Sequence, residues 1–289
     1  AVSDDDARLL YATDDTGFRL YKLFVKDLKS GAVQGPLAER VTSVAWAADS
    51  RTVLYVTEHA VTKRPDTLWR LEIGGTPVKV YEETDELFRI GVGRTKDKRF
   101  VVLASGSTDT WDQRLLPAGA PGGELRPVLP REKGHKYDVE HRDGTLFIRT
   151  NKGAKNFRLV AAPLADPSPA RWKPLVEHRT DVLLDAVEVF RDFLVVQEKQ
   201  AGLNRLRVRS FADGSWKEVA FPEPVYTAYA SGTPEFTSHR LRYGYQSLVT
   251  PSSVYDYDMA AGTSTLLKRE EGLGGFDRAS ASLVVAALT

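Results

Sequence analysis

The residue types that could form a hydrolytic site are sparse in this chain of 289 residues. The nucleophile elbow G-x-S-x-G, which presents a reactive serine on a sharp strand-to-helix turn, does not occur. Its nearest approach is Ala104-Ser105-Gly106-Ser107-Thr108, which lacks the second glycine and lies at the end of a predicted strand. We therefore interpret this string as a polar loop. The absence of cysteine excludes thiolate nucleophiles, thiolate metal ligands and disulfides.

Five histidines are the candidate metal ligands and proton carriers. His135 and His141 are six residues apart and do not fit the H-E-x-x-H helix of zinc peptidases, and no group of carboxylates completes a metal site. Since most isolated histidines of this kind are surface or loop residues, we expect the same for most of these five: His59, His135, His141, His178 and His239. No glycine-rich phosphate loop precedes a helix either. The sequence thus predicts no catalytic set, no metal site and no cofactor.

Two short runs place charged side chains at alternating positions. Asp138 and Glu140 form one run, and Arg205, Arg207 and Arg209 form the other. A period of two puts each set on one face of a strand. The acidic pair could line a channel, and the arginines could bind phosphate or carboxylate. A solvated strand surface is the favoured interpretation of both runs, because charges on strands usually face water.

The elements that would position these residues are β-hairpins that recur along the chain. Residues 41–56 (VTSVAWAADSRTVLYV) comprise an apolar run, a polar turn and a second apolar run rich in β-branched and aromatic residues. Equivalent apolar residues of successive hairpins lie 44, 48, 45, 48 and 46 residues apart: Leu10, Leu54, Val102, Phe147, Val195 and Leu241. This period is typical of β-propeller blades. The dipeptide Trp111-Asp112 occurs once, so it does not indicate WD repeats.

The spacing predicts an all-β, single-domain propeller of four-stranded antiparallel blades. The six repeats are 1–40, 41–86, 87–134, 135–180, 181–223 and 224–272, and 273–289 is predicted to be a linker and a closing strand. The clearest blade has strands at 43–48, 52–58, 67–73 and 78–81, with Gly74-Gly75 in its third turn. The first repeat has at most residues 1–3 as its own first strand. Since 283–288 is apolar and in phase with the repeats, we expect it to pair with the first repeat and close the ring.

Composition and charge narrow the class of protein. Forty basic residues against 39 acidic ones give a net charge of +1, which does not indicate nucleic-acid binding. No apolar run reaches the length of a membrane span, and the first ten residues, AVSDDDARLL, lack the basic and apolar segments of a signal peptide. Together with the absence of cysteine, these features predict a cytoplasmic location.

Several long strings resemble the β-propeller domain of oligopeptidase B, in the prolyl oligopeptidase family of serine peptidases. LRYGYQSLVTPSSVYDYDMAAGTSTLLKREEGLGGFD (241–277) is similar to the last propeller blade, and AVSDDDARLLYATDDTG, YDVEHRDGTLFIRTNKGAKNFRLV and AFPEPVYTAY match in phase elsewhere. The likeness covers nearly all of residues 1–277. It implies a propeller of seven blades over the mouth of a separate α/β-hydrolase domain. The first family blade and the hydrolase domain have no counterpart here, so we expect an isolated or engineered propeller, or a fragment.

The resemblance implies that catalysis resides outside this chain. The family's Ser–Asp–His triad and the acidic residues that select basic substrate side chains lie in the hydrolase domain, so no catalytic residue carries over. We expect the chain alone to be inactive and the parent protein to be a serine endopeptidase or oligopeptidase cleaving after basic residues. In that protein the propeller would gate the access of short peptides. The alternative is a stand-alone or engineered propeller scaffold that binds a protein or a small ligand.

The expected partners follow from the same resemblance. They are the α/β-hydrolase domain and short peptide substrates. We expect binding to neither nucleic acid nor a membrane. The chain itself is expected to be a monomer or a strand-swapped dimer. One end of the ring would face the hydrolase domain. Loops on that side, such as 59–64 and 245–251, are expected to expose apolar patches and unpaired residues.

Overall fold

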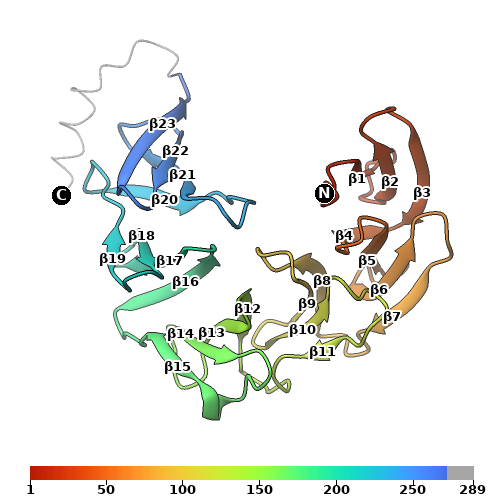
Figure 1. Cartoon of the computed structure of the whole chain (residues 1–289), viewed down its shortest axis with the longest axis horizontal. Helices are drawn as coiled ribbons and strands as arrows, with labels where there is room; N and C mark the ends of the chain where they lie inside the picture. The colour runs from red at the N-terminus through yellow and green to blue at the C-terminus, as the bar shows by residue number, and fades with distance from the viewer. Residues whose placement is uncertain (272–289) are drawn as a thin grey trace. The chain divides into compact units, whose positions relative to one another are not determined.

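The computed structural model describes residues 1–271, which form six antiparallel sheets (Figure 1). In every sheet, neighbouring strands are consecutive in the chain. The first sheet has three strands and the other five have four each, which confirms the all-β propeller of four-stranded blades for all but the first blade. No helix in residues 1–271 is long and apolar enough to cross a membrane. The predicted closing strand, 283–288, lies outside the described residues.

The chain divides into two compact units, and the division falls within the fourth blade. The N-terminal unit comprises Ala1–Thr150 and Ala162–Trp172, and the C-terminal unit comprises Asn151–Ala161 and the residues from Lys173 onward. The prediction of one domain stays a prediction.

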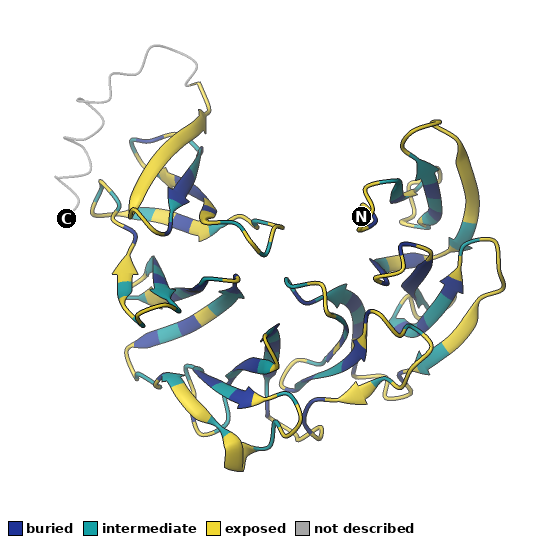
Figure 2. Ribbon diagram, viewed as in Figure 1, coloured by how far each residue is buried: buried dark blue, intermediate teal, exposed yellow. Residues whose placement is uncertain are grey.

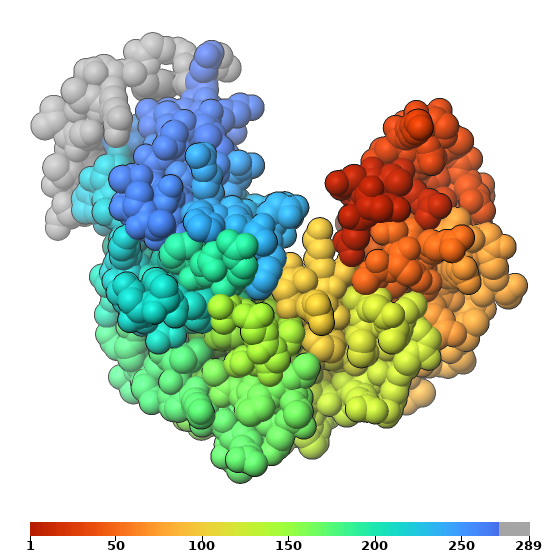
Figure 3. All heavy atoms as spheres, in the orientation of Figure 1, coloured from red at the N-terminus to blue at the C-terminus, as the bar shows by residue number. Residues whose placement is uncertain are grey.

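The first three blades belong to the N-terminal unit. Their strands are β1 (Arg8–Thr13), β2 (Lys22–Asp27) and β3 (Val33–Glu39); β4 (Val41–Trp46), β5 (Thr52–Glu58), β6 (Pro65–Glu72) and β7 (Val78–Glu82); and β8 (Arg89–Arg94), β9 (Phe100–Gly106), β10 (Trp111–Pro117) and β11 (Arg126–Pro127). In the space-filling view these blades, coloured red to yellow, form one continuous body (Figure 3).

The remaining blades follow the same pattern. The fourth contains β12 (Tyr137–Arg142), β13 (Thr145–Thr150), β14 (Arg158–Pro163) and β15 (Lys173–Val176), with a short 3-10 helix at Pro169–Arg171 before its last strand. The fifth contains β16 (Val182–Val189), β17 (Phe193–Gln200), β18 (Leu203–Ser210) and β19 (Trp216–Glu218), and the sixth contains β20 (Tyr226–Ala230), β21 (Arg240–Ser247), β22 (Ser253–Asp258) and β23 (Thr263–Arg269).

The middle strands bury both faces, and β5 shows why its sequence is apolar without a break. Successive side chains of a strand point to opposite faces. Val53 and Tyr55 therefore pack in the core shared with the first sheet, whereas Leu54 and Val56 pack in the core shared with the third sheet. Last strands such as β3, β11 and β23 are mostly exposed (Figure 2). The cores thus lie between sheets.

The turn of the predicted hairpin is fixed by its aspartate. Asp49 Oδ1 accepts hydrogen bonds from the backbone N–H groups of Arg51 (2.9 Å) and Thr52 (2.8 Å), and Oδ2 accepts one from the Thr52 hydroxyl (2.7 Å). This is the local bonding that makes aspartate a turn former. Gly74 has φ of +88° in the third turn of the same blade, a conformation that favours glycine.

The first blade differs from the others because an isolated bridge stands where the other blades have a first strand. Val2 forms an isolated bridge with Leu9, and the main chains of Ala1 and Leu10 exchange two hydrogen bonds of 2.7 and 2.8 Å. Beyond that bridge, β1 is the edge of its sheet.

Replacing Leu54 tests whether the inter-sheet cores support the fold. Leu54→Ala should lower the free energy of unfolding by about 2–5 kcal/mol, because it leaves a cavity in a fully buried core. Val78→Ala is the matched control, since Val78 is a half-exposed residue on an outer strand and its loss should cost less than about 0.5 kcal/mol. Denaturant-induced unfolding of both variants gives the comparison. Equal losses would contradict the assignment of the core.

Candidate functional site

A buried charge cluster joins four segments of the N-terminal unit around Arg131. Arg131 Nε lies 2.5 Å from Asp112 Oδ2, and Nη2 lies 2.6 Å from Glu83 Oε2. Nη2 also donates to Ser105 Oγ at 2.9 Å, and that hydroxyl donates to Glu83 Oε2 at 2.9 Å. Asp112 is on β10 and Ser105 is on β9. Glu83 follows β7, and Arg131 lies between β11 and β12.

The cluster satisfies its charges internally. The side chains of Glu83 and Asp112 are only 4% and 2% exposed. Arg114 donates to Asp112 Oδ1 at 2.8 Å, so two guanidinium groups meet two carboxylates. The Arg131 guanidinium carbon also lies 3.8 Å from the centre of the Phe88 ring, a cation–π contact.

These contacts set the protonation of the cluster. Burial alone would raise the pKa of Glu83, but hydrogen bonds from Arg131 and Ser105 outweigh it and lower the pKa to about 2. Burial opposes the charge on Arg131 as well, yet its bonds to Glu83 and Asp112 raise its pKa above the ordinary value. Glu83 and Arg131 are therefore both charged at neutral pH, and they form an ion pair within the cluster.

This network is not a nucleophile–base arrangement. Ser105 Oγ donates to a carboxylate and accepts from a guanidinium, so no neutral base takes its proton. The interpretation of Ser105 as part of a polar loop was wrong: it is a buried strand residue, because it pairs with Asp112 in the register of β9 and β10. Trp111-Asp112 looked uninformative, yet Asp112 is a member of the network.

The histidines divide into two groups, two of them buried and three at least partly exposed, and only His141 is neither a surface nor a loop residue, which agrees with the expectation for most of them. His135 is buried, with Nε2 2.7 Å from Thr150 Oγ1. His141 is buried on β12, with Nδ1 2.5 Å from Asp97 Oδ2. Residues 1–271 hold no group of three or more histidine and acidic side chains able to bind a metal ion. The buried pair instead connects neighbouring segments.

The alternating acidic pair lies on one face of β12, as the period of two predicts. Val139 between them is buried, and both carboxylates have partners. Asp138 forms an ion pair of 2.5 Å with Arg149, and Glu140 Oε2 accepts a hydrogen bond from the Lys96 backbone N–H at 3.0 Å. Burial raises the pKa of Asp138, and Arg149 counteracts that shift. The pair is therefore bonded, where a solvated lining was expected.

The three arginines of β18 also share one face, but that face is not a free anion platform. Arg207 lies 3.1 Å from Glu198, a buried carboxylate that also accepts from Arg179, and stacks over Trp216 with 4.5 Å to the ring centre. Arg205 lies 3.7 Å from Glu218. These partners come from neighbouring strands or loops, which is why the spacing of the arginines alone could not reveal them.

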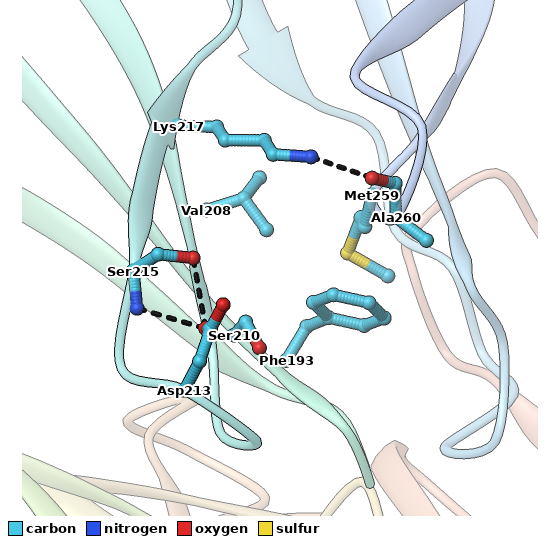
Figure 4. Close-up of a pocket in the computed structure, with 8 residues that line it drawn as sticks. All are labelled: Phe193, Val208, Ser210, Asp213, Ser215, Lys217, Met259 and Ala260. Carbon is cyan, nitrogen blue, oxygen red and sulfur yellow. Dashed lines mark hydrogen bonds between the residues drawn. The ribbon is translucent and has the colours of Figure 1, made fainter.

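A small pocket lies between β17, β18 and the β22–β23 turn, and the charged groups that line it also have hydrogen-bond partners (Figure 4). Asp213 accepts hydrogen bonds from the Ser215 N–H (3.0 Å) and hydroxyl (2.8 Å), which lower its pKa to about 2. Lys217 Nζ donates to the Ala260 carbonyl at 2.5 Å. Phe193 and Met259 supply apolar surface. The pocket has a volume of about 230 Å³, and its charged side chains are hydrogen-bonded within the protein. These bonds hold turns of the C-terminal unit in place.

The Arg131 network predicts an acid-dependent stability. Since the pKa of Glu83 is depressed to about 2 in the fold, Glu83 stabilises the protein above its ordinary pKa of 4.5 and loses this effect as the pH falls toward 2. The loss should approach about 3 kcal/mol. Unfolding free energies measured from pH 6 to 3 should fall more steeply for the unmodified protein than for Glu83→Gln. Parallel pH profiles would contradict this role of Glu83.

A second variant separates the network from ordinary surface ion pairs. Arg131→Ala leaves two buried carboxylates short of a partner and should lower the free energy of unfolding by about 3–5 kcal/mol. The exposed Arg126–Glu124 pair is the matched control, and Arg126→Ala should cost less than about 1 kcal/mol. Denaturant unfolding at pH 7 distinguishes the two. A loss below about 1 kcal/mol for Arg131→Ala would show that the network does not support the loops.

The comparisons with known proteins agree with the blade architecture. Residues 1–270 match the family described as prolyl oligopeptidase, N-terminal beta-propeller domain. Dipeptidyl aminopeptidase BI of Pseudoxanthomonas mexicana is 36% identical over 96% of this chain and 38% of its own length, and protease 2 of Moraxella lacunata is 28% identical over 96% and 40%.

Solved structures give the same assignment. Oligopeptidase B from Leishmania major superposes with a TM-score of 0.86 at 29% identity, covering 95% of this chain and 40% of that protein. Oligopeptidase B from Trypanosoma brucei, solved with covalently bound antipain, also gives 0.86 at 30% identity, over 96% and 41%. The chain thus spans about two fifths of the length of these relatives. It belongs to the family of prolyl oligopeptidase N-terminal β-propeller domains.

Proposed function

We propose that this chain is the non-catalytic propeller of an oligopeptidase B-like serine peptidase and that it gates the access of short peptides to a separate hydrolase domain. Its location would be the cytoplasm, since a chain without cysteine suits a reducing compartment. The observation that carries the proposal is the position of the most exposed apolar side chains, which lie on loops that emerge at the same end of the blade strands.

The most exposed large apolar side chains are at loop tips. Among residues 1–271, Val61 is 82% exposed, Phe18 80%, Leu87 77% and Leu248 71%, whereas the next, Val33, is 52% exposed. Val61 and Leu248 lie in loops that join the second strand of a blade to the third. Phe18 lies in the β1–β2 loop, which is the equivalent loop of the three-stranded first blade. Leu87 lies in the connection from one blade to the next. In an antiparallel blade both loop types emerge at the same end of the strands.

Contacts in the N-terminal unit confirm that its loops of this type are neighbours. Arg64 Nη1, at the end of the Val61 loop, donates to the carbonyls of Glu83 (3.0 Å), Asp85 (3.2 Å) and Phe88 (3.0 Å) in the Leu87 loop. Phe18 shares a pocket with Thr62 of the Val61 loop. Three apolar tips therefore lie on adjoining loops, an arrangement typical of a surface that a partner covers.

The polar residues of these loops are bonded, contrary to the expectation of unpaired groups. Arg64 is bound to three carbonyls, and Thr250 is buried with its hydroxyl 2.7 Å from Glu223 Oε1. Tyr245 is buried as well and bonds to the same carboxylate. The surface that these loops leave exposed is therefore apolar. Such surface supports a hydrophobic docking face, and the length of the relatives supports a further domain as the occupant.

A docking test follows from the loop tips. The double variant Val61→Glu, Leu87→Glu should weaken binding of the chain to the hydrolase domain of an oligopeptidase B-like enzyme at least tenfold, because it places charges in an apolar interface. Val33→Glu, Val78→Glu is the matched control on outer strands. Isothermal titration calorimetry provides the affinities. Equal affinities for the two double variants would contradict docking through this end.

Gating is tested by substrate size. When the unmodified chain is bound, the hydrolase domain should cleave a folded protein substrate at least tenfold more slowly and an arginyl amide at a similar rate. The chain alone should cleave neither and should not react with a fluorophosphonate probe. A protein-cleavage rate that is unchanged by the chain would refute gating, and stoichiometric labelling of the chain would refute its non-catalytic role.

A further inference from the structure

His59 holds the tip of the β5–β6 loop by accepting two main-chain hydrogen bonds on one ring nitrogen. Its Nδ1 accepts from the backbone N–H groups of Val61 and Thr62, both at 3.2 Å. The ends of the loop are joined by the main chain itself, because the His59 N–H donates to the Arg64 carbonyl at 2.8 Å and the Lys63 N–H donates to the His59 carbonyl at 3.0 Å. The ring therefore fixes only the tip, which carries the exposed Val61.

Aspartate forms the same pair of bonds in turns elsewhere in the chain. Asp27, Asp49 and Asp258 each accept from the N–H groups two and three residues ahead, at distances from 2.7 to 3.1 Å. Main-chain N–H groups of the turn are the largest cause of the lowered pKa of Asp27 and of Asp258. These carboxylates therefore remain acceptors in mild acid. His59 makes the same bonds with a group that gains a proton in the neutral range.

The other loops with exposed apolar tips are held by hydroxyl and carboxylate groups. The Phe18 N–H donates to Thr16 Oγ1 at 3.1 Å, and the Leu87 N–H donates to Asp85 Oδ1 at 3.0 Å. In the equivalent loop of the sixth blade, Ser247 Oγ accepts from the N–H groups two and three residues ahead at 3.1 and 2.9 Å. Hydroxyl and carboxylate oxygens keep their lone pairs from about pH 5 to 8, whereas histidine ordinarily gains a proton in this range. The Val61 loop thus differs from these loops in how its bonds respond to pH.

The surroundings of His59 allow its ring to take up a proton. The side chain is exposed, so water reaches it. Charged side chains of the loop and of adjoining strands are paired with one another: Lys63 with Glu58 at 3.3 Å, Arg64 with Asp66 at 3.4 Å, and Lys79 with Glu82 at 2.6 Å. Two further cations, Arg19 and Arg89, line the pocket that Lys63 also lines.

Glu82, at the end of β7, is the carboxylate that interacts with His59. Lys79 lowers the pKa of Glu82 most, and the charges of Arg64 and His59 lower it further. An imidazolium at this position is therefore attracted to Glu82. Protonation of His59 both breaks its two hydrogen bonds to the loop and favours this other interaction.

We propose that His59 is a pH-sensitive latch that orders the tip of the Val61 loop at neutral pH and releases it in mild acid. In the neutral ring the proton is on Nε2, and Nδ1 accepts from Val61 and Thr62. When Nδ1 takes a proton it becomes a donor, so both bonds are lost while the ends of the loop stay joined. The bonds are therefore present above the ordinary titration range of histidine and are lost as the pH falls through it.

The latch is a property of this chain alone and requires neither the hydrolase domain nor the gating proposed above. Its consequence is that a partner covering Val61 meets a preorganised tip at neutral pH. In mild acid the same partner must also overcome the entropy of ordering the tip, which weakens binding.

Backbone ¹⁵N relaxation of the full chain tests the latch without any partner. The order parameters of Val61 and Thr62 should be about 0.85 at a pH of about 7.5 and should fall below about 0.6 at a pH of about 5.5. Arg51 and Thr52 are the internal control, because Asp49 holds their N–H groups in the same way. Their order parameters should be equal at the two pH values.

Three variants separate the latch from a general effect of acid. His59→Asn keeps a side-chain acceptor that does not titrate, so the tip should stay ordered at both pH values. His59→Ala removes the acceptor, and the tip should be disordered at both. His239→Asn is the matched control, since His239 is an exposed histidine of the C-terminal unit that bonds to Asp192, and it should leave the pH response of Val61 unchanged.

Three results would overturn the proposal. The first is a tip that stays ordered in acid in the unmodified protein. The second is a loss of order in acid that persists in His59→Asn, because the titrating group would then be another one. The third is a tip that is as ordered in His59→Ala as in the unmodified protein, since the two bonds to Nδ1 would then not hold it.

Discussion

The burial of both faces of the middle strands is the constraint on which the rest of the structure depends. A strand such as β5 contributes Val53 and Tyr55 to one core and Leu54 and Val56 to the next, so each sheet is stabilised only by having neighbours. Apolar side chains in such positions each contribute roughly 1.5–3 kcal/mol by leaving water. Side chains in the loops are free of this constraint, and function can reside there.

The loops at one end of the strands are held by several bonds and yet expose apolar side chains. In the N-terminal unit, Arg131 binds the carboxylates of Glu83 and Asp112, which anchors the connection between the second and third blades to β10. Arg64 holds the same connection through its carbonyls. Leu87 is thus displayed on a connection that is bonded at several points. A preorganised loop loses little entropy when a partner covers it, which favours its use as a docking surface.

Local features of the fold were predictable from the sequence because local interactions determine them. The Asp49 turn and the run TVLYV belong to one short hairpin, and the strand at 52–58 begins and ends as expected. The last strand of the third blade is only Arg126–Pro127, since Pro127 has no main-chain donor to extend the pairing.

The candidate site was not predictable in the same way, because its members are distant in sequence. Glu83 and Arg131 are 48 residues apart, and Ser105 lies between them in a string that suggested only a loop. His141 and Asp97 are 44 residues apart. Isolated polar residues in predicted strands were the available signal, since a buried charge requires a partner. The sequence offered no means of choosing which partner each would find.

In the proposed function, the loops bearing Phe18, Val61 and Leu87 contact the hydrolase part of a longer peptidase. Amide hydrogen exchange measured on this chain alone and on an oligopeptidase B-like enzyme that contains it tests this contact directly. We expect slower exchange in residues 14–21, 59–64 and 83–88 of the longer protein, with unchanged exchange in the turns at 28–32 and 73–76 at the opposite ends of the same strands. Protection confined to 28–32 and 73–76, or no difference at either end, would contradict it.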